Sequence, residues 1–241
     1  MTELFWKRVM QVTDKEVLLF IVAVVTSGFI LSFRRWGAPE FDLIVGLVNF
    51  GVFTLYFTVL FIIFIFVQRF IATLYGYKAY FTLWKFGPVV GVLITFMTYG
   101  WIPFLYLGNT MLEPIKNLRI GRYRREIQFK ELMIVGVSGP LALFAVVLLI
   151  LEPLYFILEL PFLIDLILVS SIIIFFTSLP LPHTNAMNIL LYSRAIWLSL
   201  VIFGLINIML ILTLSIFYYV ISLMMTLTFI LFFKYYSKDF F

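Results

Sequence analysis

The stretch that decides the fold is Leu43–Val67, LIVGLVNFGVFTLYFTVLFIIFIFV. It holds no charged residue, and it reaches the roughly 17–25 residues that a helix needs to cross the hydrocarbon core of a bilayer. Inside that core every backbone amide must be bonded within a helix or a closed barrel. The run lacks the strict alternation of barrel strands, so we expect a transmembrane helix.

The whole chain has the composition of a membrane protein. Of its 241 residues, 64% are apolar and only 12% are charged, which is too little polar surface to cover a soluble globule of this size. The absence of cysteine excludes disulfides, thiolate nucleophiles and thiolate metal sites. The net charge of +5 would suit nucleic acid, but the basic residues lie in short loops between apolar segments, where they set membrane orientation. We therefore expect no nucleic-acid partner and no cofactor.

Further apolar runs extend this interpretation along the chain. Spans are predicted at 17–33, 43–67, 132–151, 162–179, 195–214 and 218–233. The last two belong to one apolar stretch, which as a single helix would be about 58 Å long, roughly twice the core thickness. That stretch must fold back, and we place the turn near Ser215–Tyr219. The fold class predicted is an all-α polytopic membrane protein with a single integral membrane domain, residues 1–241.

Residues 86–111 are apolar enough to span, but they carry four glycines and two prolines among β-branched and aromatic residues. This composition predicts two short strands that turn at Gly100–Pro103. If the segment re-enters and leaves on one side, only Arg34 and Arg35 of the 17 lysines and arginines lie on the far side. That partition satisfies the positive-inside rule. We therefore predict about six transmembrane helices, a short re-entrant β hairpin, and both termini on the cytoplasmic side of the cell membrane.

The loop at 112–131 is strongly basic. Its first interpretation is an orientation signal that lies on anionic lipid headgroups, and its second is a docking surface for an acidic partner. The candidate interaction residues are Lys116, Arg119, Arg122, Arg124 and Arg125.

Three acidic residues gather on the opposite side, in and beside one outer loop. They are Glu152, Glu159 and Asp165. We expect them to be solvated, since acids at a membrane edge usually are, and a cation site is the lesser alternative.

Three segments share an order and a spacing that carry a resemblance. They are FIFVQRFIATLYGYKAYF at 64–81, VSGPLAL at 137–143 and LPLPHTNA at 179–186. The first is similar to the metal helix and tyrosine-glycine-tyrosine exit of the site-2 protease family of intramembrane metalloproteases, especially its archaeal members. The second resembles that family's alanine-glycine-proline motif, and the third its proline-rich segment ending in aspartate-glycine. The resemblance covers roughly residues 43–200 and implies a site-2-protease-like fold.

The catalytic residues of that family are missing from this chain. The resemblance places the two histidines of the metal helix at Phe64 and Gln68, the general-base glutamate at Ile65 and the third zinc ligand at Asn185. The whole chain has one histidine, His183, and no cysteine, so it cannot assemble the usual imidazole or thiolate set around zinc. We expect an inactive homologue rather than an enzyme. His183 itself is expected to be an interfacial residue, with a proton or metal role as the lesser alternative.

The resemblance also implies what replaced the metal. Gln68 and Asn185 would face each other across the former metal cavity, while Phe64 and Ile65 would fill it. The alternative is that Gln68 caps a helix end beside Arg69.

The function expected is that of a non-catalytic subunit, scaffold or client-binding factor in a larger membrane complex. Its partners would be other membrane subunits or transmembrane helices, in contact with the lipid bilayer. The alternative is a small-molecule or ion transporter or channel component, for which Asn49 and Asn207 are the main interior polar residues.

Overall fold

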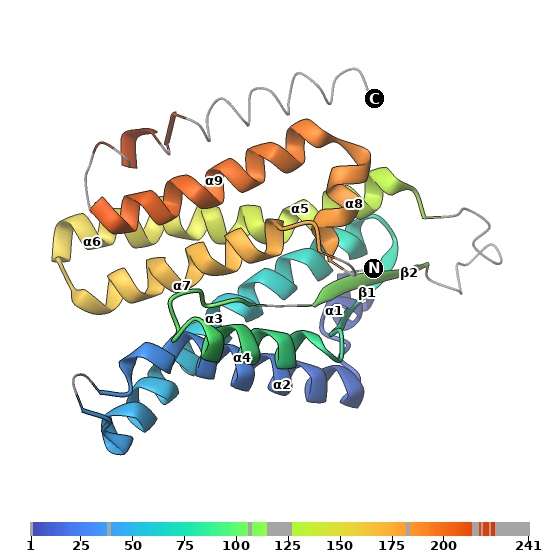
Figure 1. Ribbon diagram of the computed structural model, residues 1–241. Coiled ribbons are helices and arrows are strands. Elements are labelled where there is room, and N and C mark those ends of the chain that lie inside the picture. The colour runs from blue at the N-terminus through green and yellow to red at the C-terminus, as the bar shows by residue number, and fades with distance from the viewer. Residues whose placement is uncertain are drawn as a thin grey trace, which may run out of the picture.

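The structure is a computed structural model that describes residues 2–37, 40–105, 108–114, 127–181 and 184–213, together with positions 217, 219–221, 223 and 224. These residues form a bundle of helices with one small sheet (Figure 1). The side chains that fill the bundle are overwhelmingly apolar.

Four helical segments, at 14–35, 43–74, 129–158 and 161–178, are long and apolar enough to cross a membrane. They are α2 (Asp14–Ser32) with a 3-10 turn, α3 (Leu43–Leu74), α5 (Phe129–Val146) continued by η2 (Val147–Leu151) and α6 (Glu152–Leu158), and α7 (Pro161–Ser178). Each corresponds to one of four predicted spans, although the second and third run seven residues past the predicted ends at 67 and 151, and the assignment to a membrane is supported.

The remaining described helices are not among these four candidate spans. They are α1 (Thr2–Val9), α4 (Gly87–Met97), α8 (Asn185–Tyr192) and α9 (Arg194–Thr213). Helix α9 lies where the span at 195–214 was predicted. Most of the predicted span at 218–233 and of the turn predicted before it lies outside the described residues.

Polar side chains mark where the long helices begin. Thr13 and Glu16 form a reciprocal capping box at the start of α2, as each side chain accepts a hydrogen bond from the other residue's backbone amide. Asp42 caps α3 by accepting hydrogen bonds from the amides of Ile44 and Val45. These caps satisfy amides that the first helical turn leaves without partners.

The sheet consists of two antiparallel strands, β1 (Tyr77–Thr82) and β2 (Asn109–Pro114). Its register pairs Tyr77 with Pro114 and Thr82 with Asn109. Gly108, which precedes β2, has φ +78°, and a Cβ added there would lie 2.3 Å from the carbonyl oxygen of Thr82. Glycine is therefore required where the returning chain meets the end of β1.

The hairpin predicted within residues 86–111 is wrong in its secondary structure. Residues 87–97 form helix α4, with Pro88 in its first turn, where its missing N–H is not needed. The turn predicted at Gly100–Pro103 is present, with positive φ at Tyr99 and Gly100, but it joins α4 to an extended return. The β-branched residues were overridden by packing of α4 against α2, where Gly91 allows close approach to Ile30.

The excursion between the strands starts and ends at one place, because Thr82 and Asn109 are paired. With 11 residues, α4 is about 16 Å long, which is about half of the hydrocarbon core. By itself this helix is too short to span the core, and the chain after it returns to the end of the sheet where the excursion began.

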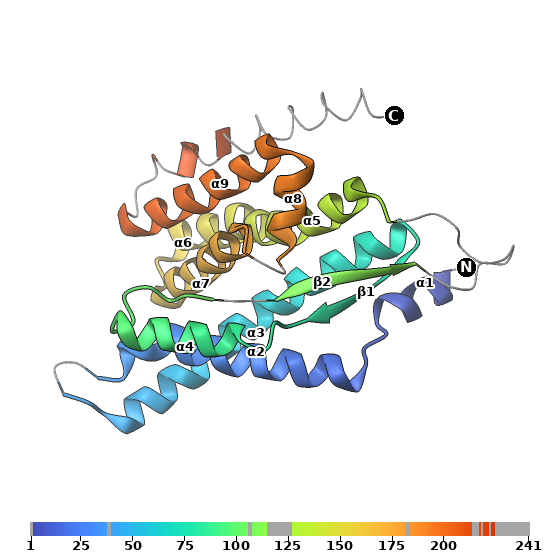
Figure 2. The ribbon, with the colours of Figure 1, turned by 45° about the vertical axis from the view of Figure 1, so that its right-hand side comes forward.

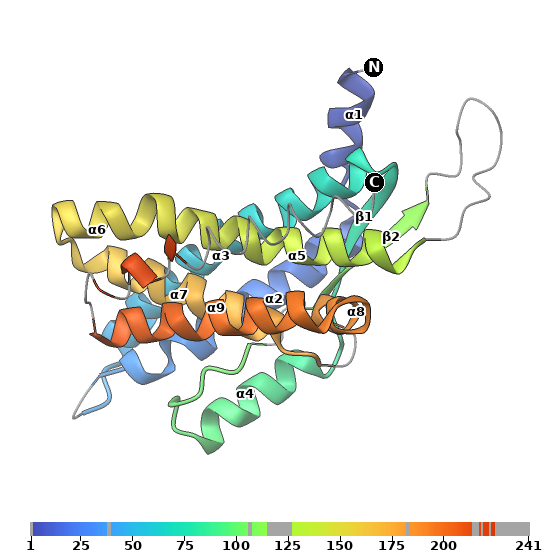
Figure 3. The same cartoon turned by 90° about the horizontal axis from the view of Figure 1, so that it is seen from above.

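The core of the bundle lies along α3. Phe53, Phe57, Phe61 and Phe64 recur at helical spacing and are all buried. Their rings are in contact, with centroids 5.1 Å apart for Phe57 and Phe61 and 5.8 Å apart for Phe61 and Phe64. Helix α3 packs mainly against α2 and α5 (Figures 2 and 3), while α7 packs against α9.

Candidate functional site

Gln68, which the resemblance places at a zinc ligand position, is fully buried inside α3. Its Nε2 donates to the carbonyl oxygen of Gly136 in α5 at 3.4 Å, and its Oε1 accepts a hydrogen bond from the hydroxyl of Thr110 in β2. The side chain therefore links two helices and the sheet. It does not cap a helix end, since α3 continues to Leu74.

Asn185 lies at the start of α8, half-buried, on the far side of Gly136. Together with Phe64 and Pro140 it lines a cavity of about 10 Å³, close to the smallest volume that holds one water molecule. No hydrogen bond joins Asn185 to Gln68 in the described residues. Phe64 is one of the residues that line this cavity, and Gln68 bonds to partners other than Asn185.

Two glycines of α5 make this close packing possible. A Cβ added at Gly139 would lie 2.7 Å from Phe64 Cε2 and 2.8 Å from Gln68 Nε2. One added at Gly136 would lie 3.2 Å from the Cβ of Asn185. Gly139 thus lets α5 approach α3, and Gly136 lets it approach α8, as small residues do in many membrane helix pairs. The Ser-Gly-Pro segment thus has a packing role at this position.

A buried ion pair involves Arg69, the residue that follows Gln68 in α3. Arg69 Nη2 donates to Glu16 Oε1 at 2.6 Å, and the two side chains are 9% and 5% exposed. The same Oε1 accepts a hydrogen bond from the backbone amide of Phe81 at 2.7 Å. Glu16 therefore joins α2, α3 and β1. The spacing of Thr13 and Glu16 is the sequence signal of a helix cap. It does not indicate the pairing of Glu16 with Arg69, because 53 positions separate these two residues.

Ile65 does not face the small cavity of Phe64. It lines a separate groove of about 250 Å³ between α1, α2 and α3, with Val9, Phe20, Phe66 and the Glu16–Arg69 pair. Phe64 and Ile65, which the resemblance places at catalytic positions, therefore lie on different sides of α3.

The largest cavity described has a volume of about 500 Å³ and two arginines in its wall. We call it the arginine pocket. It lies between the end of α2, the middle of α3 and α7, the turn after α4, and α9. Its wall includes Arg34, Arg35, Phe53, Trp101, Ile172 and Phe175. An apolar cavity with a few polar groups is the usual form of a ligand site.

The two arginines of the pocket differ in how they are held. Arg35 makes two hydrogen bonds to Asp165, at 3.0 and 2.6 Å, and lies 4.7 Å from the ring centroid of Phe53. Arg34 lies over the ring of Trp101, 3.9 Å from its centroid. No carboxylate pairs with Arg34 within the described residues. The pocket therefore carries a positive charge that is not neutralised there.

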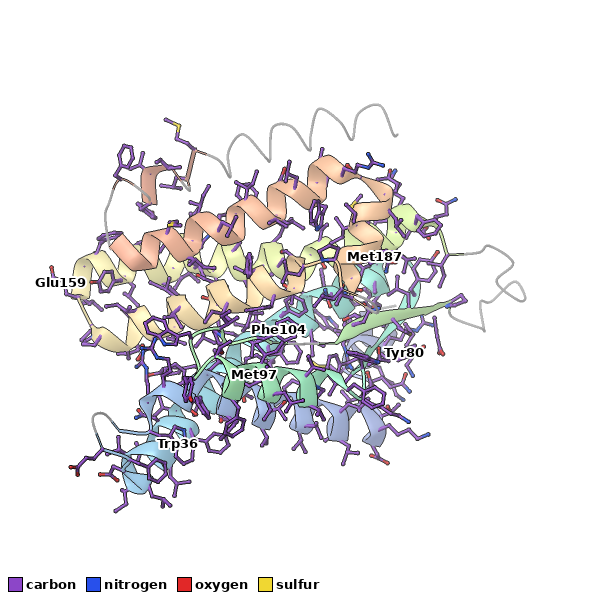
Figure 4. All side chains as sticks on the ribbon, viewed as in Figure 1. Trp36, Tyr80, Met97, Phe104, Glu159 and Met187 are labelled. Carbon is purple, nitrogen blue, oxygen red and sulfur yellow. The ribbon has the colours of Figure 1, made fainter. Side chains whose placement is uncertain are left out.

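The acids predicted to be solvated on the outer side fall into three environments. Glu159 is exposed at the turn between α6 and α7 (Figure 4). Asp165 is paired with Arg35. Glu152 is fully buried in α6, so the prediction of a solvated loop residue is wrong for it: the helix continues through Pro153 to Leu158. No group of three metal-ligating side chains occurs within the described residues.

Other predicted residues lie beyond the described ranges or have local roles. Lys116, Arg119, Arg122, Arg124, Arg125 and His183 lie outside the described residues. Asn49 donates to the carbonyl oxygen of Arg35 at 2.7 Å, so it ties α3 to the end of α2. Asn207 is buried in α9 and donates to the carbonyl oxygen of Phe203 at 2.9 Å.

The chain was compared with protein-family models, with curated proteins and with solved structures, and none of them matches it. The resemblance to the site-2 protease family therefore stays a prediction that rests on the three sequence segments.

Proposed function

We propose that this chain is a non-catalytic membrane protein that acts as a subunit, scaffold or client-binding factor of a larger membrane complex. The observation that carries the proposal is the packing at the position where the resemblance would place zinc. Gln68 is buried and bonded to two neighbours, and about 10 Å³ remains beside Phe64. A metal-bound water and a substrate carbonyl need more space than this. With one histidine and no cysteine in the sequence, the zinc protease chemistry of that family has no ligands.

The arginine pocket is the site that we assign to the client. Its volume of about 500 Å³ suits a group of side-chain or small-ligand size rather than a whole helix. Its wall is mainly apolar, and Arg34 brings a positive charge with no carboxylate partner among the described residues. A client that fits combines an apolar segment with an acidic group near the membrane edge.

We further propose six spans, a site-2-protease-like arrangement and both termini in the cytoplasm. The Arg35–Asp165 pair supports the topology, because it places the end of α2 and the start of α7 at one end of the bundle. The sheet lies toward the other end, where α3 finishes and α5 begins (Figure 1). Only Arg34 and Arg35 among the basic residues would then be on the outer side.

The test is purification of the tagged full chain from its membrane in mild detergent, followed by identification of the subunits that come with it. Arg34→Gln removes the charge of the pocket, and Ile172→Trp fills its apolar part. Lys15→Gln and Leu47→Trp are the matched controls, since both residues are exposed on α2 and α3, away from the pocket wall.

We expect the same partner with wild type and both controls, and at least a tenfold lower yield of it with either pocket variant. Equal recovery with all four variants would remove the pocket from the proposal. A purified wild type that contains one zinc per chain and no partner would overturn the proposal as a whole.

A transporter or channel component is the second candidate function. The observation that favours it is polar groups without partners inside apolar helices: both carboxyl oxygens of Glu152 and the Oδ1 of Asn207. Such residues are rare in membrane spans and often mark transport pathways. Flux of protons or alkali cations into liposomes that contain the purified chain alone, lost in Glu152→Gln, would favour this candidate over client binding.

A further inference from the structure

The carboxyl group of Glu152 is the least compensated polar group in the described bundle. Its residue is 0% exposed, and neither carboxyl oxygen has a hydrogen-bond partner. It lies in the continuous helical segment 129–158, which is long and apolar enough to span a membrane. At this end of the bundle, α6 and η2 pack against α7 through a buried cluster of Val147, Leu151, Leu163 and Ile167. The described residues around it therefore offer no group that stabilises a negative charge.

The backbone just before Glu152 departs from the α-helix. Val147–Leu151 form a π-helical turn, and the amide of Glu152 donates to the carbonyl oxygen of Val147, five residues back. Pro153 follows and cannot donate to the carbonyl of Leu149. The extra residue of a π turn rotates the following helix by about one residue position, roughly 100°. The π turn therefore decides which side of the helix carries Glu152, and it turns this residue into the bundle.

No charged group among the described residues pairs with Glu152. The titratable side chains on the elements packed around it are Tyr155 in α6, Glu159 at its end, Asp165 in α7, and Tyr219, which lies near Phe156. Asp165 is engaged by Arg35, and Glu159 is exposed. None of them donates a hydrogen bond to Glu152 within the described part of the chain. An isolated carboxylate in apolar surroundings takes up a proton rather than stay charged.

We propose that Glu152 is a proton-binding site inside the membrane-spanning bundle, and that the π turn at Val147–Leu151 is the conformational element linked to it. With the proton bound, the neutral carboxyl stays in the apolar interior. Release of the proton creates a charge that must reach water or a cation, which requires the turn to open or to shift toward a regular α-helix. This inference is independent of the client-binding proposal, since neither Glu152 nor Val147–Leu151 belongs to the wall of the arginine pocket.

The first experiment measures the protonation of Glu152 directly, in the full chain reconstituted in lipid nanodiscs. Infrared difference spectra of wild type against Glu152→Gln should show the carbonyl stretch of a protonated carboxylic acid at neutral pH. The apolar reagent dicyclohexylcarbodiimide should label the same residue. In that reaction the carboxyl proton moves to a carbodiimide nitrogen, the oxygen adds to the central carbon, and the adduct rearranges to an N-acylurea without a leaving group.

Glu159→Gln is the matched control, because Glu159 is an exposed carboxylic acid at the C-terminal cap of the same helix, α6. We expect the infrared band and the label to persist in this variant and to disappear in Glu152→Gln. A spectrum in which Glu152 contributes only a carboxylate band at neutral pH would overturn the proposal, as would labelling confined to Glu159.

The second experiment tests the link to the π turn. As the pH is raised until the Glu152 band is lost, the protection factors at residues 147–152, corrected for the base-catalysed rise in intrinsic amide exchange, should fall by at least tenfold. Those at residues 164–174 of α7 should stay unchanged. Glu152→Gln should abolish the fall. Loss of the band with unchanged protection factors at residues 147–152 would refute the link, even if the proton site itself is present.

Discussion

The close approach of α3 and α5 can be tested by comparing two glycine-to-alanine variants, one at the contact and one away from it. Gly139→Ala places a Cβ 2.7 Å from Phe64 Cε2 and 2.8 Å from Gln68 Nε2. Gly51→Ala is the matched control, since it also lies inside a helix and nothing lies within 4 Å of its added Cβ. Both substitutions gain the same helix propensity, roughly 0.5–1 kcal/mol. The difference between them therefore isolates the steric clash.

Overpacking of a well-packed interior costs about 1–3 kcal/mol. We expect Gly51→Ala to be as stable as wild type or slightly more stable, and Gly139→Ala to lie about 1–3 kcal/mol below Gly51→Ala. This difference is roughly 5- to 150-fold in the unfolding equilibrium constant. It is large because the obstacle is a buried ring and an amide bonded to Gly136, not the mobile end of a surface side chain.

The assay is reversible unfolding in mixed micelles, titrated with a denaturing detergent and followed by tryptophan fluorescence. Phe64→Leu in the Gly139→Ala background removes the ring atoms nearest to the new methyl group and should restore part of the lost stability. If Gly139→Ala is as stable as Gly51→Ala, the two helices are not in the contact described, and the packed interpretation of the former metal position fails.

Three further predictions use the same unfolding assay or a metal measurement. Arg69→Met should destabilise the fold by about 3–5 kcal/mol, because it leaves the Glu16 carboxylate buried without its cation. Adding Glu16→Gln should recover most of this loss. If Arg69→Met alone has no effect on stability, the buried pair is contradicted. Gln68→Leu should lower the free energy of unfolding by about 1–3 kcal/mol, because it leaves the Thr110 hydroxyl without its acceptor. Adding Thr110→Val to this variant should reduce the loss. If the losses of the two single variants simply add in the double variant, the two side chains do not interact. After incubation with zinc and desalting, the purified wild type should hold no more zinc than a Gln68→Ala variant, as measured by inductively coupled plasma mass spectrometry. One zinc per wild-type chain would refute the filled site.

The positions of the membrane helices could be predicted because they depend on local sequence. A long run without charges, such as Leu43–Val67, has few ways to satisfy its backbone in a bilayer other than a helix. Chemistry was also predictable where it needs a residue type: with a single histidine and no cysteine, the chain lacks the zinc ligands of the resembling family however it folds. The turn at Gly100–Pro103 likewise follows from residues that favour it locally.

The secondary structure of residues 86–97 was not predictable in this way. Their β-branched and aromatic composition favours strands, yet they form α4, because this short apolar segment packs against α2 and because Pro88 fits a helical first turn. The paired strands lie on either side of the predicted hairpin, at Tyr77–Thr82 and Asn109–Pro114. Strand pairing joins distant segments, and the pattern of each segment alone does not specify its partner.

The sequence by itself determined that this chain belongs in a membrane, where its main apolar helices lie, and that the zinc ligands of the resembling family are absent. The tertiary structure alone decided which polar groups meet. It joined Gln68 to Thr110 rather than to Asn185, brought Arg69 to Glu16, and left Glu152 buried without a partner among the described residues. The physical reason is that burial of a polar group is set by the elements packed around it. Those contacts form between residues that are dozens of positions apart, and no local pattern encodes them.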